Sequence, residues 1–216
     1  TERRKNLLME SDIRHLPETD CRKAAKALAR SFRNDPGCLF VFSTPERCEK
    51  GMRRIFRSWL RIMATHKACW TVPDCSGVAV WYSSAAKPAL ACAALFQTGL
   101  WRLPLYMTPA EQYRGIRFFR DLKKRTENEE TEEHWVLDTL GVAPEAQGKG
   151  IASALVRQGL QHADKAGKPA RVITHNPANV PFYRQFGFEP VESGCIAGTE
   201  VQVIVMRRKV SDTVCC

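Results

Sequence analysis

Residues 134–156 read HWVLDTLGVAPEAQGKGIASALV, and this stretch decides the fold. It begins with a run of apolar and β-branched residues, Trp135–Val142, that is typical of a buried strand. A glycine-containing turn, Gln147–Gly150, follows, and apolar residues then recur at helical spacing over 152–163. The sequence therefore predicts a strand, a glycine turn and a helix in succession.

The start of that helix is a predicted phosphate-binding site. The first backbone N–H groups of a helix lack intrahelical acceptors, and the helix dipole adds to their attraction for anions. Gly148 and Gly150 have no Cβ, so a pyrophosphate can approach the backbone closely. The P-loop pattern is excluded because no Ser or Thr follows Lys149 directly. The dinucleotide pattern is excluded because Ser153 stands where its third glycine is needed.

The pattern that fits is Gln-x-x-Gly-x-Ala, formed by Gln147, Gly150 and Ala152 directly after Leu-Gly-Val. It resembles the acetyl-CoA-binding motif of the GNAT superfamily of N-acetyltransferases. Downstream, Asn176–Phe188 (NPANVPFYRQFGF) resembles the second cofactor motif of the same family. Two motifs in this order, separated by one helix and one strand, are far more specific than either alone.

The resemblance implies an α/β (α+β) GNAT fold, a single domain whose mixed central sheet of about seven strands is flanked by helices. We expect this domain over residues 11–210, between an N-terminal extension (1–10) and a C-terminal tail (211–216). Residues 83–126 form an expected helical insertion, which either determines substrate specificity or only packs against the sheet.

Local patterns predict the remaining elements. Strands are expected over 11–16, 69–72, 78–82, 170–174, 188–191 and 201–207, and helices over 46–66, 109–125 and 180–186. An earlier helix carries the apolar stripe Ala24–Phe32 and ends at Asn34–Gly37, and Gly194–Gly198 is a predicted turn.

Acetyl-CoA is the cofactor that the resemblance implies. The backbone around Leu140 would pair with its pantetheine arm, and the amides of Gly148–Ser153 would hold its pyrophosphate. The implied cofactor-binding residues are Leu140, Gly141, Val142, Gln147, Gly148, Lys149, Gly150, Ile151, Ala152, Ser153, Asn179 and Tyr183. The alternative is that the glycines only make a tight turn between strand and helix.

Tyr183 is the expected general acid, since it stands at the position of the family's tyrosine. A phenol with a pKa of about 10 is protonated at neutral pH and can donate a proton to a leaving thiolate. The alternative is a tyrosine that packs in the core beside Phe182 and Phe186.

Asp138 is the candidate general base or amine anchor. Side chains alternate along a strand, so Asp138 is expected to share a face with Val136 and Leu140. Burial in this apolar strand would raise its pKa. The alternative is a hydrogen-bonded structural carboxylate.

Glu133 and His134 are further candidate substrate-binding residues at the mouth of the strand, and with Glu132 they are alternative bases. Glu132 and Glu133 end an acidic run, Glu127–Glu133, which is expected to be a solvated loop or to attract a cationic amine.

Composition limits the partners. The net charge of +10 is spread along the chain, and Arg53, Arg54, Arg57 and Arg61 form a predicted solvated helix face, so neither nucleic acid nor a membrane is an expected partner. The nine cysteines are odd in number and form no metal-ligand spacing. We therefore expect a cytoplasmic protein without disulfides or a metal site. Cys215–Cys216 is expected to belong to an unstructured tail with two thiols, and the alternative is a double-cysteine prenylation signal.

The expected function is acetyl transfer from acetyl-CoA to a primary amine of a small molecule, by direct attack in a ternary complex. The chain looks most similar to puromycin N-acetyltransferase-like enzymes, which implies antibiotic resistance or detoxification. The alternatives are acetylation of a protein or peptide lysine or of a polyamine, and a non-catalytic CoA-binding regulatory module. An open groove in place of a closed pocket would favour a peptide acceptor. A monomer or a homodimer is expected.

Overall fold

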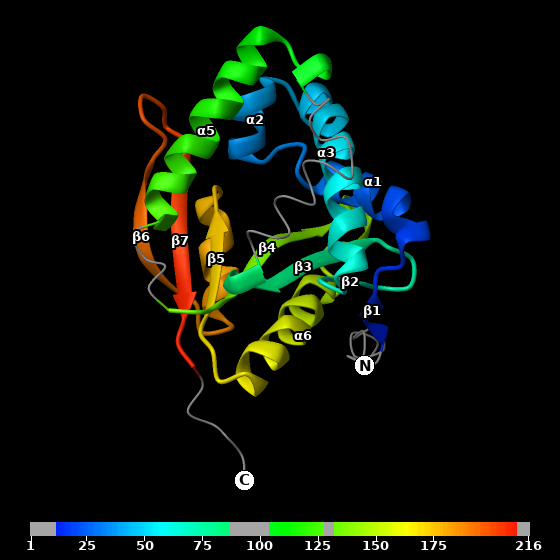
Figure 1. Cartoon of the computed structure of the whole chain (residues 1–216). Helices are drawn as coiled ribbons and strands as arrows, with labels where there is room; N and C mark the ends of the chain where they lie inside the picture. The colour runs from blue at the N-terminus through cyan, green and yellow to red at the C-terminus, as the bar shows by residue number, and fades with distance from the viewer. Residues whose placement is uncertain (1–11, 87–103, 128–131, 211–216) are drawn as a thin grey trace.

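A computed structural model describes residues 12–86, 104–127 and 132–210 (Figure 1). One seven-stranded sheet runs through the molecule in the order β1-β2-β3-β4-β5-β7-β6. Neighbouring strands are antiparallel except β4 and β5, which are parallel. The strands are β1 (Arg14–His15), β2 (Cys69–Thr71), β3 (Gly77–Ser83), β4 (Trp135–Val142), β5 (Ala170–Thr174), β6 (Glu189–Cys195) and β7 (Gln202–Arg208). The predicted mixed sheet is confirmed.

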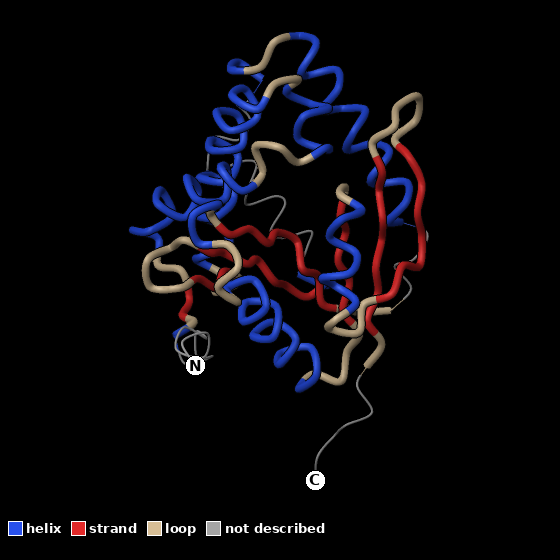
Figure 2. The backbone as a smooth tube through the Cα atoms, turned by 180° about the vertical axis from the view of Figure 1, so that it is seen from behind, coloured by secondary structure: helices blue, strands red, loops and turns tan. Residues whose placement is uncertain are grey.

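Helices cover both faces of this sheet, as Figure 2 shows from behind. The α-helices are α1 (Cys21–Ser31), α2 (Pro36–Phe42), α3 (Pro45–Thr65), α5 (Pro109–Glu127), α6 (Ile151–Lys165) and α7 (Val180–Arg184). Apolar side chains of α1 and α3 form one core with one face of β3, and those of α6 form a second core with the other face.

Strand β3 supplies both cores because its side chains alternate. Val78 and Val80 pack with α1 and α3, whereas Ala79 and Trp81 pack with α6. All four are completely buried. Gly159 of α6 faces the Trp81 ring so closely that an added Cβ would overlap it. This close approach fixes α6 against the middle of the sheet.

Three local predictions differ from the structure. The described part of the first strand contains only Arg14–His15, and β6 continues through Cys195, so the predicted turn begins too early. Helix α2 was not expected, because Asn34–Gly37 signals the end of α1. The same residues also start α2, where Asp35 accepts a hydrogen bond from the Cys38 N–H (3.0 Å).

Several predictions lie outside the described residues. They are the N-terminal extension, most of the apolar part of the insertion, the middle of the acidic run and the Cys215–Cys216 tail. Within the described ranges, no helix has the length and apolar character needed to cross a membrane.

Candidate active site

A first cavity forms where β4 and β5 separate. The two strands pair only at their starts, Trp135–Leu137 with Ala170–Val172. Beyond Leu137, β4 continues to pair only with β3, so one edge of its backbone faces away from any partner strand. A cavity of about 620 Å³ opens at this edge. The separation of β4 from β5 therefore places the end of β4 beside the first cavity, which a ligand can enter.

The start of α6 borders the same cavity. The Ala154 N–H makes the first helical bond, to the Gly150 carbonyl (3.0 Å), so the N–H groups before it have no intrahelical acceptor. Gly150 is the N-cap residue and no side chain caps the helix. Gly148 and Gly150 have φ values of +76° and +81°, a conformation that favours glycine. The predicted anion-binding turn is thus present in the structure.

The implied cofactor-binding residues converge on this cavity. All of them except Lys149, which is exposed, line it: Leu140, Gly141, Val142, Gln147, Gly148, Gly150, Ile151, Ala152, Ser153, Asn179 and Tyr183. Gln147 also ties the turn to the strand, since its Nε2 donates to the Val142 carbonyl (3.1 Å). Asn179 is held by a bond from its Nδ2 to Thr174 Oγ1 (3.2 Å).

Tyr183 lines the cavity from α7. Its side chain is buried, with its ring packed against those of Phe182 and Phe188. Burial raises the pKa of Tyr183 well above its usual value, and the nearby negative charge of Asp35 adds to this effect. No described residue accepts a hydrogen bond from its hydroxyl. The phenol therefore stays protonated at neutral pH.

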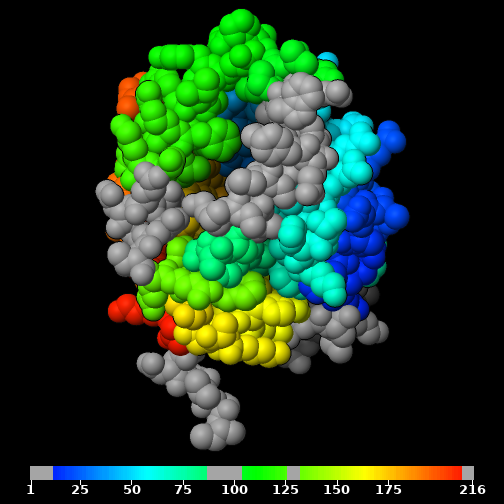
Figure 3. Space-filling view, in the orientation of Figure 1, coloured from blue at the N-terminus to red at the C-terminus, as the bar shows by residue number. Residues whose placement is uncertain are grey.

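A second cavity of about 740 Å³ lies between the sheet and helices α2, α3 and α5. Phe32 and Asp35 line both cavities, so the two spaces adjoin. Figure 3 shows a hollow beside α5, with residues of α2 visible at its floor. The protein thus holds two neighbouring cavities.

Helix α5 is clamped over the second cavity at both ends. Near its start, the buried Glu111 carboxylate accepts bonds from Arg47 of α3 (2.9 and 2.6 Å). These bonds lower the pKa of Glu111. Near the other end, Arg125 pairs with Glu192 of β6 (3.2 Å) and donates to the Cys195 carbonyl (2.8 Å). The described part of the insertion is therefore a fixed wall of the cavity.

Asp138 is the extra residue of a β-bulge. In the pairing with β3, Leu137 lies opposite Trp81 and Thr139 lies opposite Val80, which leaves Asp138 without a counterpart. The alternation of side chains shifts at this point. Leu140 therefore packs toward α6, and the prediction that it shares a face with Asp138 is wrong.

The Asp138 carboxylate points instead toward α3 and lines the second cavity. The Nε1–H of Trp59 donates to its Oδ2 (2.9 Å), and the Tyr82 hydroxyl donates to its Oδ1 (3.1 Å). The expected burial is also wrong, because the residue is exposed. The bulge turns this side chain out of the apolar core and into the cavity.

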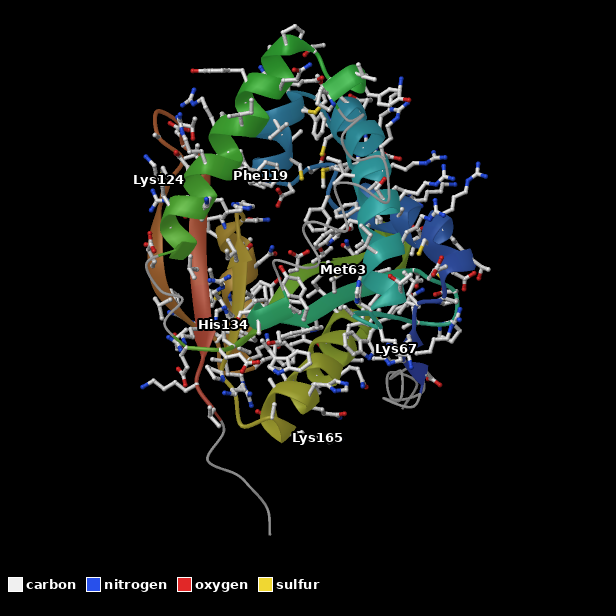
Figure 4. The ribbon with its side chains drawn as sticks, in the orientation of Figure 1. Met63, Lys67, Phe119, Lys124, His134 and Lys165 are labelled. Atoms are coloured by element: carbon white, nitrogen blue, oxygen red, sulfur yellow. The ribbon has the colours of Figure 1, made fainter. Side chains whose placement is uncertain are left out.

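Glu133 and His134 lie elsewhere. The Ser83 hydroxyl bonds to Glu133 (2.8 Å), and this contact, with the charge of Lys168, lowers the pKa of its carboxyl group. His134 is buried immediately before β4, distant from Phe119 of α5 in Figure 4. Neither residue is among the described lining of the two cavities.

Comparisons with known proteins agree with this geometry. Residues 113–188 match the model of the acetyltransferase (GNAT) family. An uncharacterized N-acetyltransferase of Schizosaccharomyces pombe is 26% identical over 175 residues, which are 78% of this chain and 70% of the relative. Over this segment the chain resembles the GNAT acetyltransferase family, and its architecture is the GNAT fold. It is an acyltransferase, and acetyl-CoA is the acyl donor of the family.

Solved structures share the GNAT fold. The crystal structure described as histone acetyltransferase HPA2 and related acetyltransferase from Corynebacterium glutamicum is 17% identical, covers 94% of this chain and 98% of its own, and has a TM-score of 0.63. Arylalkylamine N-acetyltransferase 2 from Aedes aegypti is 11% identical, covers 92% and 98%, and has a TM-score of 0.57.

The residues of the first cavity fit acetyl-CoA. Unpaired N–H groups and two left-handed glycines at the cavity edge suit a pyrophosphate, and the unpaired edge of β4 suits an amide-containing arm. The glycine turn and the helix start belong to the motif that the sequence analysis identified.

The sequence motifs missed two further residues, Asp35 and His175. Both line the second cavity. Nδ1 of His175 lies 3.2 Å from the Gln202 carbonyl, and its ring lies 4.9 Å from that of Phe118. Burial lowers the pKa of His175. The Asp35-Pro36 pair at a helix start was an available signal for the first residue, whereas His175 has none in its local sequence.

Proposed function

We propose that this chain transfers acetyl from acetyl-CoA to the primary amine of a small molecule, by direct attack in a ternary complex. The observation that carries the proposal is that the two cavities adjoin at Phe32 and Asp35. A donor in the first cavity and an acceptor in the second would then meet at this junction. Such juxtaposition supplies much of the acceleration of a two-substrate reaction.

The first cavity would hold the donor. Acetyl-CoA supplies an activated acyl group on a thiolate leaving group. The N–H groups at the start of α6 would hold its pyrophosphate, and the edge of β4 around Leu140 would hold its pantetheine arm. Tyr183 would give its proton to the departing sulfur, a role supported by its raised pKa and its place in the cavity wall.

The second cavity would prepare the amine, which must be neutral to attack. The Gln202 carbonyl can only accept a hydrogen bond, so Nδ1 of neutral His175 carries the proton and Nε2 keeps its lone pair. We assign His175 as the general base. Asp138 would anchor the ammonium form, since two donors from Trp59 and Tyr82 fix its carboxylate.

The clamped helix α5 supports a small acceptor over a peptide, because it closes one side of the second cavity. A detoxifying or resistance enzyme of the puromycin N-acetyltransferase type, acting in the cytoplasm, is the physiological setting that we propose. The substrate class is tested by free-thiol release from acetyl-CoA with aminonucleosides, aminoglycosides, arylamines, polyamines and histone-tail peptides. Turnover with a small amine supports the proposal, and turnover with peptides alone overturns it.

A further inference from the structure

We infer that the acceptor is a cationic primary amine with an aryl or alkyl body. Its ammonium group would lie near Asp138 and Asp35, and its body would lie against α2, α3 and α5. This inference rests on the proposed function and deepens it, because it names the kind of amine. It follows from the lining, the charge and the size of the second cavity.

The wall of the second cavity is largely apolar. Phe56 and Ile55 line it from α3, and Val41 lines it from α2. From α5, Ile116 and Phe119 line it although each is 67% exposed. Large apolar side chains are rarely left open to water in a concave wall without a ligand to cover them. An apolar body would remove this surface from water.

The charged side chains that line the cavity are negative. Asp35 and Asp138 line it, and no lysine or arginine does so among the residues that the structure describes. Asp35 also lines the cofactor cavity, so negative charge lies beside the junction. An ammonium group drawn to Asp35 would therefore lie beside the cavity proposed for the acyl donor.

The apolar wall of the second cavity disfavours amines that carry several charges or additional polar groups. A polyamine or an aminoglycoside carries several charges, and burying the extra ones against an apolar wall is costly. A lysine in a peptide brings polar backbone groups that this wall cannot satisfy. The volume of about 740 Å³ lies within the range of pockets for drug-sized ligands. One charge and one apolar body is the combination that fits.

The test is a series of straight-chain primary amines from propylamine to octylamine, with phenethylamine added. Each buried methylene contributes about 0.8 kcal/mol, so kcat/KM is expected to rise about fourfold for each added carbon until the cavity is full. Equilibrium binding of the same amines, measured calorimetrically with CoA present, gives a readout that does not need turnover.

Two variants locate the effect. Ile116→Ser and Phe119→Ser should each flatten the dependence on chain length, and both sites are exposed enough that folding should not suffer. Tyr113→Ser is the matched control, because this exposed aromatic residue of α5 lies outside the described lining of the cavity. It should leave the dependence unchanged.

The outcomes separate the two proposals. A profile that is flat in both kcat/KM and binding, or a preference for spermidine, overturns the inference while leaving acetyl transfer to an amine intact. Chain-length-dependent binding without turnover of any amine supports the cavity assignment and overturns the proposed function. An equal response of Tyr113→Ser and Phe119→Ser also overturns the inference, because the effect would then not come from the cavity.

Discussion

Tyr183→Phe tests the proposed proton donor. The substitution removes one hydroxyl and keeps the ring that packs against Phe182 and Phe188. General acid catalysis contributes about 100- to 10,000-fold, so kcat should fall by that factor, equivalent to about 2.7 to 5.4 kcal/mol of barrier. No described residue loses a hydrogen bond, so the free energy of unfolding should change by less than about 1 kcal/mol.

The assay measures kcat by thiol release at saturating donor and acceptor, and the dissociation constant of CoA by calorimetry. The dissociation constant should stay within about threefold of the wild-type value, since the pyrophosphate and pantetheine contacts are untouched. Phe188→Leu, a change to the other ring that packs against Tyr183 and lies outside the described lining of the first cavity, is the packing control. If kcat and CoA affinity fall equally in Tyr183→Phe, the hydroxyl is a cofactor contact and not the acid.

Three further predictions concern the base, the phosphate site and the helical clamp. In the wild type, kcat should fall on the acid side of the pH profile as His175 becomes protonated, and this fall should lie below pH about 6.5 because burial lowers the pKa of His175. His175→Gln should abolish this fall, since the neutral imidazole is the proposed base. An unchanged fall would assign the base to another residue. Gly150→Ala should raise the dissociation constant of CoA about tenfold. Gly167, at the other end of α6, also has a positive φ, so Gly167→Ala is the control. Both variants should lose similar stability in thermal unfolding, but Gly167→Ala should leave the dissociation constant of CoA unchanged. Arg47→Gln should lower the denaturant midpoint, because it leaves the buried Glu111 carboxylate without its cation. Since the pKa of Glu111 is lowered, its contribution is present above pH about 4.3 and is lost as pH falls through the lowered pKa; an identical acid dependence in the variant would refute this assignment.

Most of the first cavity could be predicted from the sequence because it is built from local features. Strands β4 and β5 begin and end as expected, since each is an apolar run bounded by turn residues. The glycine turn and the helix after it are adjacent in the chain. One contiguous motif was therefore enough to predict both these elements and the residues of the motif that line the first cavity.

The orientation of Asp138 could not be predicted in this way. The bulge depends on how β4 pairs with β3, a strand more than fifty residues earlier, and nothing within β4 marks it. The prediction assumed that side chains alternate along β4 without interruption, and it therefore placed Leu140 on the wrong face of the strand. The shift also explains how an acidic side chain within an apolar strand avoids burial.

The second cavity could not be predicted from local sequence patterns either. Its walls come from α2, α3, α5 and the end of β5, which only the tertiary fold brings together. His175 becomes interpretable only once the Gln202 carbonyl of β7 and the cavity are in place. Helix α2 was missed because it begins only a few residues after α1 ends.

The central claim is that donor and acceptor occupy the two cavities at the same time. Initial rates measured over a matrix of acetyl-CoA and amine concentrations test it most directly. Intersecting lines in the double-reciprocal plot are expected, because a ternary complex must form before acetyl is transferred. Parallel lines would contradict the account, since they would require an acetylated enzyme, and Cys38, which lines the second cavity, would be the thiol to examine.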